Sequence, residues 1–152
     1  MLVNINYRCT LNRETVQNMR FPTGKPSQIL DRLSKCTMVI FRSGKCRIMG
    51  CRKPLNIEDI PYEINNLKIQ SITVTANLNM KINLLHLKIK LGPLCVYEPE
   101  LFTALRYTKY SPKCVNVFSS GKVVILGLQS LLYENTVAII LNDIKNVLKF
   151  EI

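Results

Sequence analysis

The chain has 152 residues, 47% of them apolar, and its 21 Lys and Arg against 10 Asp and Glu give a formal net charge of +11. This length corresponds to one domain or to two closely packed halves, with enough apolar residues for a continuous core. The charge favours an anionic partner, nucleic acid ahead of acidic membrane, although a basic surface can also serve solubility alone. No apolar run is long enough to cross a bilayer, and the residues after Met1 lack the apolar core of a signal peptide, so we expect no membrane partner.

In chain order, the first half begins with residues 2–11, whose alternation predicts a strand with Asn4, Asn6 and Arg8 on one face. Asn12 is the expected N-cap of a short helix over residues 13–20. After it the pattern predicts one or two helical turns, a β-hairpin and a short helix, over residues 27–34, 37–50 and 57–64 respectively.

The second half repeats this order. Residues 68–77 alternate and predict a strand, and residues 80–90 predict a helix, because Ile82, Leu85 and Ile89 recur at helical spacing. An irregular segment over residues 97–102 and a second hairpin follow. Residues 130–150 predict the longest amphipathic helix, whose apolar residues would cover a sheet: Leu132, Val137, Ile140, Ile144, Val147 and Leu148.

One ten-residue motif occurs in both hairpins. Residues 41–50 read FRSGKCRIMG and residues 118–127 read FSSGKVVILG, with Phe, Ser, Gly and Lys at the same spacing. Alternation along a strand puts an aromatic, a hydroxyl and a lysine on one face of each hairpin, which is unusual for a core or a solvated face and predicts a binding surface. The residues on these faces are Phe41, Ser43, Lys45, Arg47 and Met49, and Phe118, Ser120, Lys122, Val124 and Leu126.

The duplication predicts an α+β fold made of two repeats, residues 1–66 and 67–152. A repeated unit that cannot close its own core packs against its twin. We therefore expect one long curved antiparallel sheet, with helices on one face and the other face left open.

No residue pattern for catalysis or metal binding is present. The sequence has no nucleophile beside a base, no phosphate loop and no paired carboxylates, so we predict no enzyme activity and no cofactor. The six cysteines include no Cys-x-x-Cys pair, and the one histidine, His86, lies in an apolar helical run. We expect no metal site and interpret the cysteines as core or strand residues of a protein in a reducing compartment.

The motifs YEPELF at residues 97–102, SGKVV at 120–124 and IQ at 69–70 resemble the second repeat of the TATA-box-binding protein family, the saddle-shaped general transcription factors. The resemblance covers residues 67–150. The first repeat is more distant, with F-x-S-G-K at residues 41–45 as its strongest signal and a second helix that is shortened. The resemblance implies the saddle fold predicted above, with its helices on the convex face.

The resemblance also implies that the concave face binds the minor groove of A·T-rich promoter DNA and bends it. This family is itself a standard example of kinking by apolar wedges between base steps. Phe41, Phe102 and Phe118 match three of its four wedge positions, and Ile29 matches the fourth. For each phenylalanine taken alone, core packing is the alternative interpretation.

Several matched positions depart from the family. Its base-contacting asparagines match Asn4 and Ser71, two groove-floor threonines match Met49 and Leu126, and Arg47 replaces a small apolar residue. Arg47 can enter a narrow A·T minor groove or reach phosphate, and strict TATA preference is in doubt. The predicted DNA-binding residues are Asn4, Arg8, Ile29, Phe41, Ser43, Lys45, Arg47, Met49, Ser71, Thr73, Phe102, Phe118, Ser120, Lys122, Val124 and Leu126.

In the family, the YEPELF loop is where transcription factor IIB docks, which assigns Glu98, Glu100 and Leu101 to a basic partner; an acidic turn without a partner is the alternative. We predict a nuclear initiation factor that binds and bends promoter DNA and recruits a IIB-like protein and RNA polymerase. The Asn, Ile and Lys usage suggests a large DNA virus, and then the site of viral transcription. Two other functions stay open: a protein-interaction adaptor without sequence-specific DNA binding, and a module detached from a nucleic-acid enzyme. Pairing of two copies through the open face without DNA also stays open.

Overall fold

The computed structural model describes residues 1–21, 28–32 and 36–149, with the side chains of residues 28–32 outside the description. The chain packs as two compact units, which we call the N-terminal unit (residues 3–72) and the C-terminal unit (residues 1–2 and 73–152). Strand β5 (Ile64–Asn77) contributes residues to both. The predicted repeat boundary between residues 66 and 67 stays a prediction.

The N-terminal unit is an antiparallel sheet with little helix. Its strands hydrogen-bond in the order β2-β3-β4-β1-β5. One face is packed, because Ile5, Met38, Ile40 and Ile48 have no exposed surface. Besides β5, its elements are β1 (Leu2–Leu11), α1 (Arg13–Gln17), β2 (Gln28–Arg32), β3 (Thr37–Phe41), β4 (Lys45–Cys51) and the 3-10 turn η1 (Ile57–Asp59).

Two helices predicted in this unit are wrong. Residues 28–32 form β2, which pairs along its whole length with β3, so strand pairing overrides the local helical pattern. Residues 27 and 33–34 lie outside the described residues. The helix predicted over residues 57–64 is only η1, since Ile64 already starts β5. The predicted cap of α1 is confirmed: the Asn12 side chain accepts a 2.8 Å hydrogen bond from the Thr15 amide.

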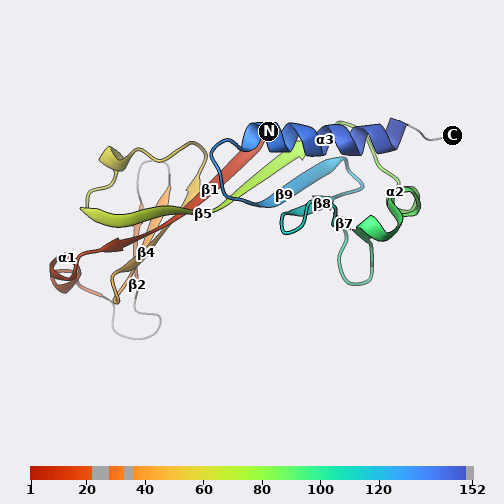
Figure 1. The fold of residues 1–152 in the computed structure, drawn as a ribbon. Coiled ribbons are helices and arrows are strands. Elements are labelled where there is room, and N and C mark those ends of the chain that lie inside the picture. Colours follow the sequence, from red (N-terminus) through yellow and green to blue (C-terminus); the bar gives the residue numbers. More distant parts are fainter. Residues whose placement is uncertain (22–27, 33–35, 150–152) are drawn as a thin grey trace. The chain divides into compact units, whose positions relative to one another are not determined.

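The C-terminal unit carries two helices on one face of its sheet. Its strands follow the order β5-β9-β8-β7-β6, and α3 lies along them (Figure 1). The long helix predicted over residues 130–150 is confirmed as α3, which buries Val137, Ile140, Ile144 and Leu148; Leu132 lies outside it and is 85% exposed. The elements are α2 (Leu84–Leu91), η2 (Gly92–Leu94), β6 (Cys95–Val96), β7 (Leu105–Tyr107), β8 (Cys114–Val117), β9 (Lys122–Leu128) and α3 (Tyr133–Lys149).

Helix α2 buries a different face from the predicted one. The expected stripe includes Leu85 and Ile89, but these side chains are 61% and 77% exposed, and Leu84, Leu87 and Leu91 are buried instead. Both sets have the same helical spacing, so periodicity alone does not distinguish them. The start of the helix decides: the Ile82 amide donates to the Ser119 carbonyl at 2.8 Å, and α2 begins only after its N-cap, Asn83.

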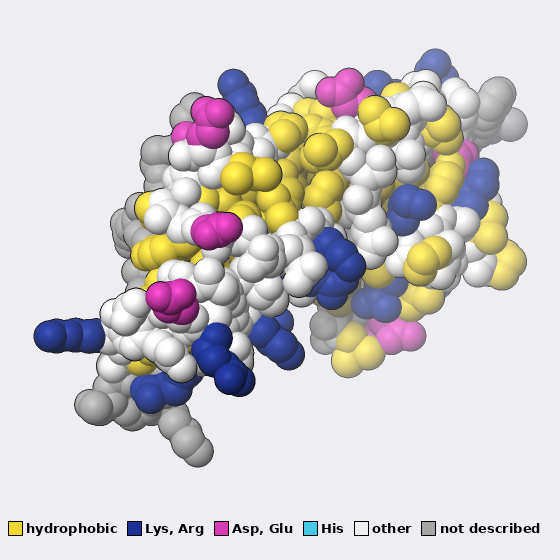
Figure 2. Space-filling model, turned by 60° about the vertical axis from the view of Figure 1, so that its left-hand side comes forward, with side chains coloured by type: hydrophobic (Ala, Val, Ile, Leu, Met, Phe, Trp, Pro, Cys, Tyr) yellow, Lys and Arg dark blue, Asp and Glu magenta, His cyan; other side chains and the backbone are white. Residues whose placement is uncertain are grey.

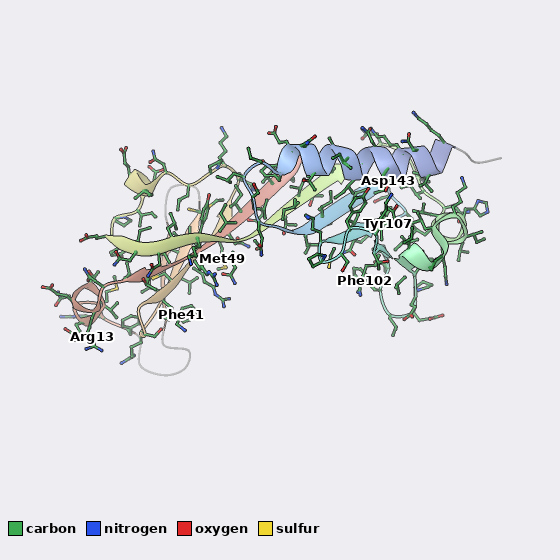
Figure 3. All side chains as sticks on the ribbon, in the orientation of Figure 1. Arg13, Phe41, Met49, Phe102, Tyr107 and Asp143 are labelled. Carbon is green, nitrogen blue, oxygen red and sulfur yellow. The ribbon has the colours of Figure 1, made fainter. Side chains whose placement is uncertain are left out.

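Asp143 joins α3 to the sheet of its unit (Figure 3). Its Oδ2 accepts hydrogen bonds from the hydroxyls of Tyr107 at 2.8 Å and Tyr110 at 2.6 Å and from Lys109 Nζ at 3.1 Å. Partial burial alone would raise the pKa of Asp143, but these hydrogen bonds and the positive charge of Lys109 outweigh it and lower the pKa. Burial and the bond to Asp143 raise the pKa of Tyr110 to about 12.

Asp143→Asn should destabilise the chain by about 1–3 kcal/mol at pH 7, because Tyr107, Tyr110 and Lys109 lose a charged acceptor. Since the pKa of Asp143 is lowered by folding, its contribution is fully present above the unfolded carboxyl pKa of about 4 and is lost as the pH falls through the folded value. Urea unfolding at pH 7 and pH 3 should therefore show a smaller acid loss in Asp143→Asn than in wild type. Glu134→Gln, which changes an exposed acid on the same helix, should keep the wild-type loss; equal losses in all three proteins would contradict this assignment.

Gly121 closes the β8–β9 hairpin where another segment passes close by. Its φ is +93°, its carbonyl accepts a 2.8 Å hydrogen bond from the Leu78 amide, and a Cβ at this position would collide with the carbonyl oxygen of Met80. Gly50 has a similar φ of +81°, but a Cβ there would meet no atom within 4 Å. Substitution of Gly50 therefore tests backbone strain alone, whereas substitution of Gly121 tests backbone strain together with a steric clash.

Gly50→Ala should cost only the conformational strain, about 1–2 kcal/mol. Gly121→Ala should cost clearly more, because the Met80 backbone must also move. Denaturant unfolding measures both. Similar losses of unfolding free energy in the two variants would mean that the Met80 backbone moves away from the new Cβ at no cost.

Candidate nucleic-acid interface

Each unit has a sheet face that no helix of the described residues covers, which we call its open face. The alternation of burial along the hairpin strands supports the predicted faces: Cys46 and Ile48 are buried, whereas Lys45 and Arg47 are exposed. In the N-terminal unit, exposed or half-buried positions include all predicted residues with described side chains: Asn4, Arg8, Phe41, Ser43, Lys45, Arg47, Met49 and Ser71.

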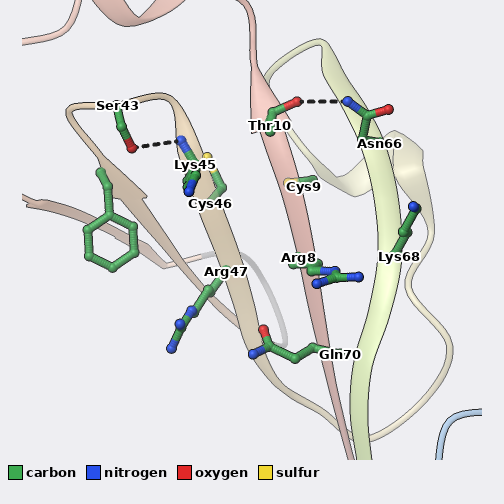
Figure 4. A pocket seen from close by; sticks show the side chains of 11 residues that line it. Arg8, Cys9, Thr10, Ser43, Lys45, Cys46, Arg47, Asn66, Lys68 and Gln70 are labelled. Carbon is green, nitrogen blue, oxygen red and sulfur yellow. Dashed lines mark hydrogen bonds between the residues drawn. The ribbon is translucent and has the colours of Figure 1, made fainter.

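The open face of the N-terminal unit contains a groove of about 580 Å³ with four cationic side chains, Arg8, Lys45, Arg47 and Lys68 (Figure 4). We call it the four-cation groove. Arg8 and Arg47 are directly opposite each other in the β1–β4 ladder, and like charges in such positions destabilise a sheet by roughly 0.2–1 kcal/mol. Among the described residues, no acid lines the groove, and the one ion pair is Lys109–Asp143. The other lining residues are Cys9, Thr10, Phe41, Ser43, Cys46, Asn66 and Gln70.

Cationic side chains are numerous on the surface of the molecule. In Figure 2, several Lys and Arg side chains lie in the lower left part, below the hydrophobic and acidic side chains. Lys68 and Gln70 of β5 are part of the groove although sequence reasoning did not select them. Gln70 belongs to the IQ motif at residues 69–70, but strict alternation back from Ser71 would put Lys68 and Gln70 on the other face, so the strand pattern did not indicate them.

Asn6 is a second residue that the predicted set lacks. Its side chain donates to Ser71 Oγ at 3.4 Å and accepts from the Gly50 amide at 3.2 Å, next to an irregularity in the β1–β4 register between Ile5 and Tyr7. It thereby fixes the position of the predicted residue Ser71. The alternation over residues 2–11 already placed Asn6 with Asn4 and Arg8 and was the available signal.

The open face of the C-terminal unit presents an aromatic pair. The Phe102 and Phe118 rings meet edge to face with centroids 6.3 Å apart, and Lys122 Nζ lies 5.4 Å from the Phe118 centroid. Phe102 is 41% exposed and lies on the side of the strands away from α3 (Figure 3). Of the other predicted residues here, Ser120 is exposed, and Thr73, Val124 and Leu126 are half-buried.

Arg106 and Asn116 also belong to this face and were missed. They are aligned with Val124 across β7, β8 and β9, and directly opposite residues share a face. The Asn116 Oδ1 atom is buried and accepts no hydrogen bond within the described part of the chain. Alternation back from Phe118 could have found Asn116, but the three residues of β7 are too few to show a pattern.

Ile29 is in a different position from its proposed counterpart Phe102. In the β2–β3 ladder, Gln28 is opposite Phe41, and Ile29 is opposite Ile40. The register therefore gives Phe41 no counterpart like the one that Phe118 has. The side chain of Ile29 lies outside the description, so its role as a wedge stays a prediction.

The predicted partner residues lie on an exposed turn. The Leu101 and Phe102 amides both donate to the Glu98 carbonyl, at 2.9 and 3.0 Å, and Glu98, Glu100 and Leu101 are exposed. Exposed apolar side chains also lie on α2, η2 and β6, the elements that precede the turn in the chain. With Leu101 of the turn, the exposed apolar residues here are Leu85, Ile89, Leu94, Val96 and Leu101.

The lysines of α2 do not shield this apolar surface. Lys88 Nζ donates to the Tyr97 carbonyl at 3.4 Å, and Lys90 Nζ donates to the Val147 carbonyl at 3.1 Å. An exposed apolar surface of this kind commonly marks a contact with another protein.

Three of the six cysteines, Cys9, Cys46 and Cys51, are buried. Burial and the contact with Cys36 raise the pKa of Cys51 to about 12, and the contact with Cys9 and burial raise the pKa of Cys46. All six thiols are free. Within the described ranges, no three His, Cys, Asp or Glu side chains gather as they would around a metal ion, and no helix has both the length and the apolar character needed to span a membrane.

The sequence of this chain is similar to those of known transcription factors. The family model described as transcription factor TFIID (or TATA-binding protein, TBP) matches residues 66–147. The TATA-box-binding protein of Methanococcus aeolicus is 36% identical over 133 residues, which cover 76% of this chain and 69% of that protein. The TBP-related factor of Drosophila melanogaster is 32% identical over 110 residues, 63% of this chain, and the match spans only 49% of the fly protein.

The fold comparison extends over nearly the whole chain. The solved structure of Methanococcus jannaschii TBP matches 95% of this chain and 97% of its own length, with a TM-score of 0.67 and 28% sequence identity. This match confirms the fold class predicted from the sequence, including the first repeat that the family model leaves largely unmatched.

Proposed function

This chain belongs to the TATA-box-binding protein family of non-enzymatic transcription initiation factors, and on that premise we propose that it binds promoter DNA through its open faces and bends it. We further propose that it recruits a factor-IIB-like protein, and with it RNA polymerase, through the turn at Glu98. The proposed place of action is the nucleus or, if the protein is viral, the site of viral transcription.

The aromatic pair Phe102–Phe118 carries the proposal for bending. Two rings in edge-to-face contact, with Phe102 41% exposed beside a lysine, are poorly placed for stability alone. Apolar side chains of this kind unstack a base step when they enter the minor groove, and the resulting bend brings more protein surface onto the DNA. Lys122 supplies a positive charge close to the wedge for a neighbouring phosphate.

The partner site is supported by exposed acids in a basic chain. Glu98 and Glu100 suit a basic surface, and the adjoining Leu101 offers apolar contact area. Interfaces of this composition combine an apolar centre with a charged rim. The exposed α2 residues Leu85 and Ile89 would enlarge that centre.

A second candidate function is an adaptor that keeps this fold without sequence-specific DNA binding. Met49 and Leu126 favour it, because they put apolar side chains where the family has hydrogen-bonding threonines. Ser71 favours it too, since its hydroxyl is shorter than the asparagine side chain that the family has at this position. The two functions differ in whether the isolated protein binds duplex DNA.

Replacing Phe102 and Phe118 with Ala should leave weak, unbent DNA binding. Losing the burial of each ring removes about 1.5–3 kcal/mol, which corresponds to at least tenfold in affinity. Energy transfer between dyes at the two duplex ends measures the bend. Leu132→Ala, an exposed apolar residue outside the sheets, should bend DNA like wild type. Unchanged bending by the double variant would show that the rings are not wedges.

Glu98→Arg combined with Glu100→Arg should retain DNA binding and lose the ternary complex with the IIB-like protein of the same source. Like charges across an interface cost several kcal/mol, enough to abolish a micromolar association. A gel-shift titration with and without the partner measures both steps. The matched control reverses Glu58 and Asp59, two exposed acids of the other unit, and should form the ternary complex. Loss of DNA binding with the partner retained would contradict the assignment of the turn.

A further inference from the structure

We propose that the four-cation groove of the N-terminal unit is a phosphate-binding site that holds the sugar–phosphate backbone of a DNA strand. This inference rests on the proposed function and refines it. The two units would then bind DNA by different chemistry, one through phosphates and the other through wedges between bases.

The floor of the groove carries unbalanced positive charge. Arg8 and Arg47 are directly opposite in the ladder, and none of the described residues that line the groove is an acid that could compensate them. An arrangement of like charges that no acid neutralises is stabilised by an anionic ligand. The guanidinium group pairs with phosphate through two parallel hydrogen bonds, which makes arginine better suited to this ligand than lysine.

The spacing of the cations in the groove also suits a phosphate backbone. Lys45 and Arg47 are two residues apart on β4, so they are about 6.5 Å apart along the strand. One strand of B-DNA carries a phosphate every 3.4 Å or so along the helix axis, so these two levels can face phosphates about two steps apart on one strand. In Figure 4, Arg8 extends from β1 toward Lys68 on β5, and Arg47 extends from β4 in another direction, which spreads the charges over the groove.

The open faces of the two units carry different kinds of side chain. Phe41 is the only predicted wedge with a described side chain in the N-terminal unit, and the residue opposite it on β2 is Gln28. In the C-terminal unit, Phe102 contacts Phe118, and the half-buried Val124 and Leu126 lie on the same face, with Arg106 and Asn116 aligned beside Val124. The N-terminal open face is therefore suited to phosphates and the C-terminal open face to base steps.

The salt dependence of DNA binding tests this site. In fluorescence anisotropy with a labelled duplex, Arg8→Ala with Arg47→Ala should reduce the slope of log K against log salt by about 1.8, since each phosphate contact contributes about 0.9. Arg8→Lys with Arg47→Lys keeps both charges and should keep the slope. Lys145→Ala with Lys149→Ala removes two exposed charges from α3 and should also leave the slope unchanged. A wild-type slope in the double alanine variant would overturn the proposal.

A comparison of two duplexes separates phosphate from base contact. If the arginines bind phosphate, the double alanine variant should lose the same factor in affinity on A·T-rich and G·C-rich duplexes of equal length. A loss confined to the A·T-rich duplex would place the arginines in a narrow minor groove and overturn the phosphate site.

Inorganic pyrophosphate separates this site from the proposed function. It should raise the thermal midpoint of wild type and of the α3 control, but not that of the double alanine variant. If the chain binds no duplex yet shows this arginine-dependent shift, the result supports the phosphate site and contradicts promoter binding. If the chain bends DNA while the arginine substitutions change neither assay, the result supports promoter binding and contradicts the phosphate site.

Discussion

The packing of one face of each antiparallel sheet fixes which side chains can meet a ligand. Val117, Val123 and Ile125 have no exposed surface, so the residues between them must point to the other side. A shift of one residue would bury Lys122 and expose the valines, which makes the register costly to change. The wedges, the cations and the hydroxyls of the open faces are all placed by this constraint.

The packed face of each sheet contributes the stability that its open face does not. In the C-terminal unit, α3 buries four apolar residues and is joined to β7 and its following loop through Asp143. The open face can therefore hold exposed aromatic rings, and in the other unit opposed arginines, without a packing role of their own. Such locally unfavourable choices are common at functional sites.

Elements with a long or duplicated pattern could be predicted from the sequence. The two hairpins, β1 and α3 were found because alternation or helical periodicity extends over many residues. Strand β2 was not, since five residues show little pattern and their conformation depends on pairing with β3. The face predicted for α2 was wrong because the triads at Leu85 and at Leu87 share one spacing, and the helix begins only after Ile82, whose amide donates to the carbonyl of Ser119 in a distant hairpin. Arg106 reaches the open face from a three-residue strand and left no local signal.

The altered positions of the open faces change what kind of DNA selectivity the fold can support. Direct readout in the minor groove depends on donors and acceptors at its floor, and Met49 and Leu126 supply neither. On the proposed binding mode, phosphate contacts through Arg8 and Arg47 would bind any sequence. Selectivity would then have to come from the deformation that Phe102 and Phe118 impose, because flexible base steps are cheaper to kink than stiff ones. The fold of the family would be retained, while DNA deformability rather than hydrogen bonding became the source of specificity.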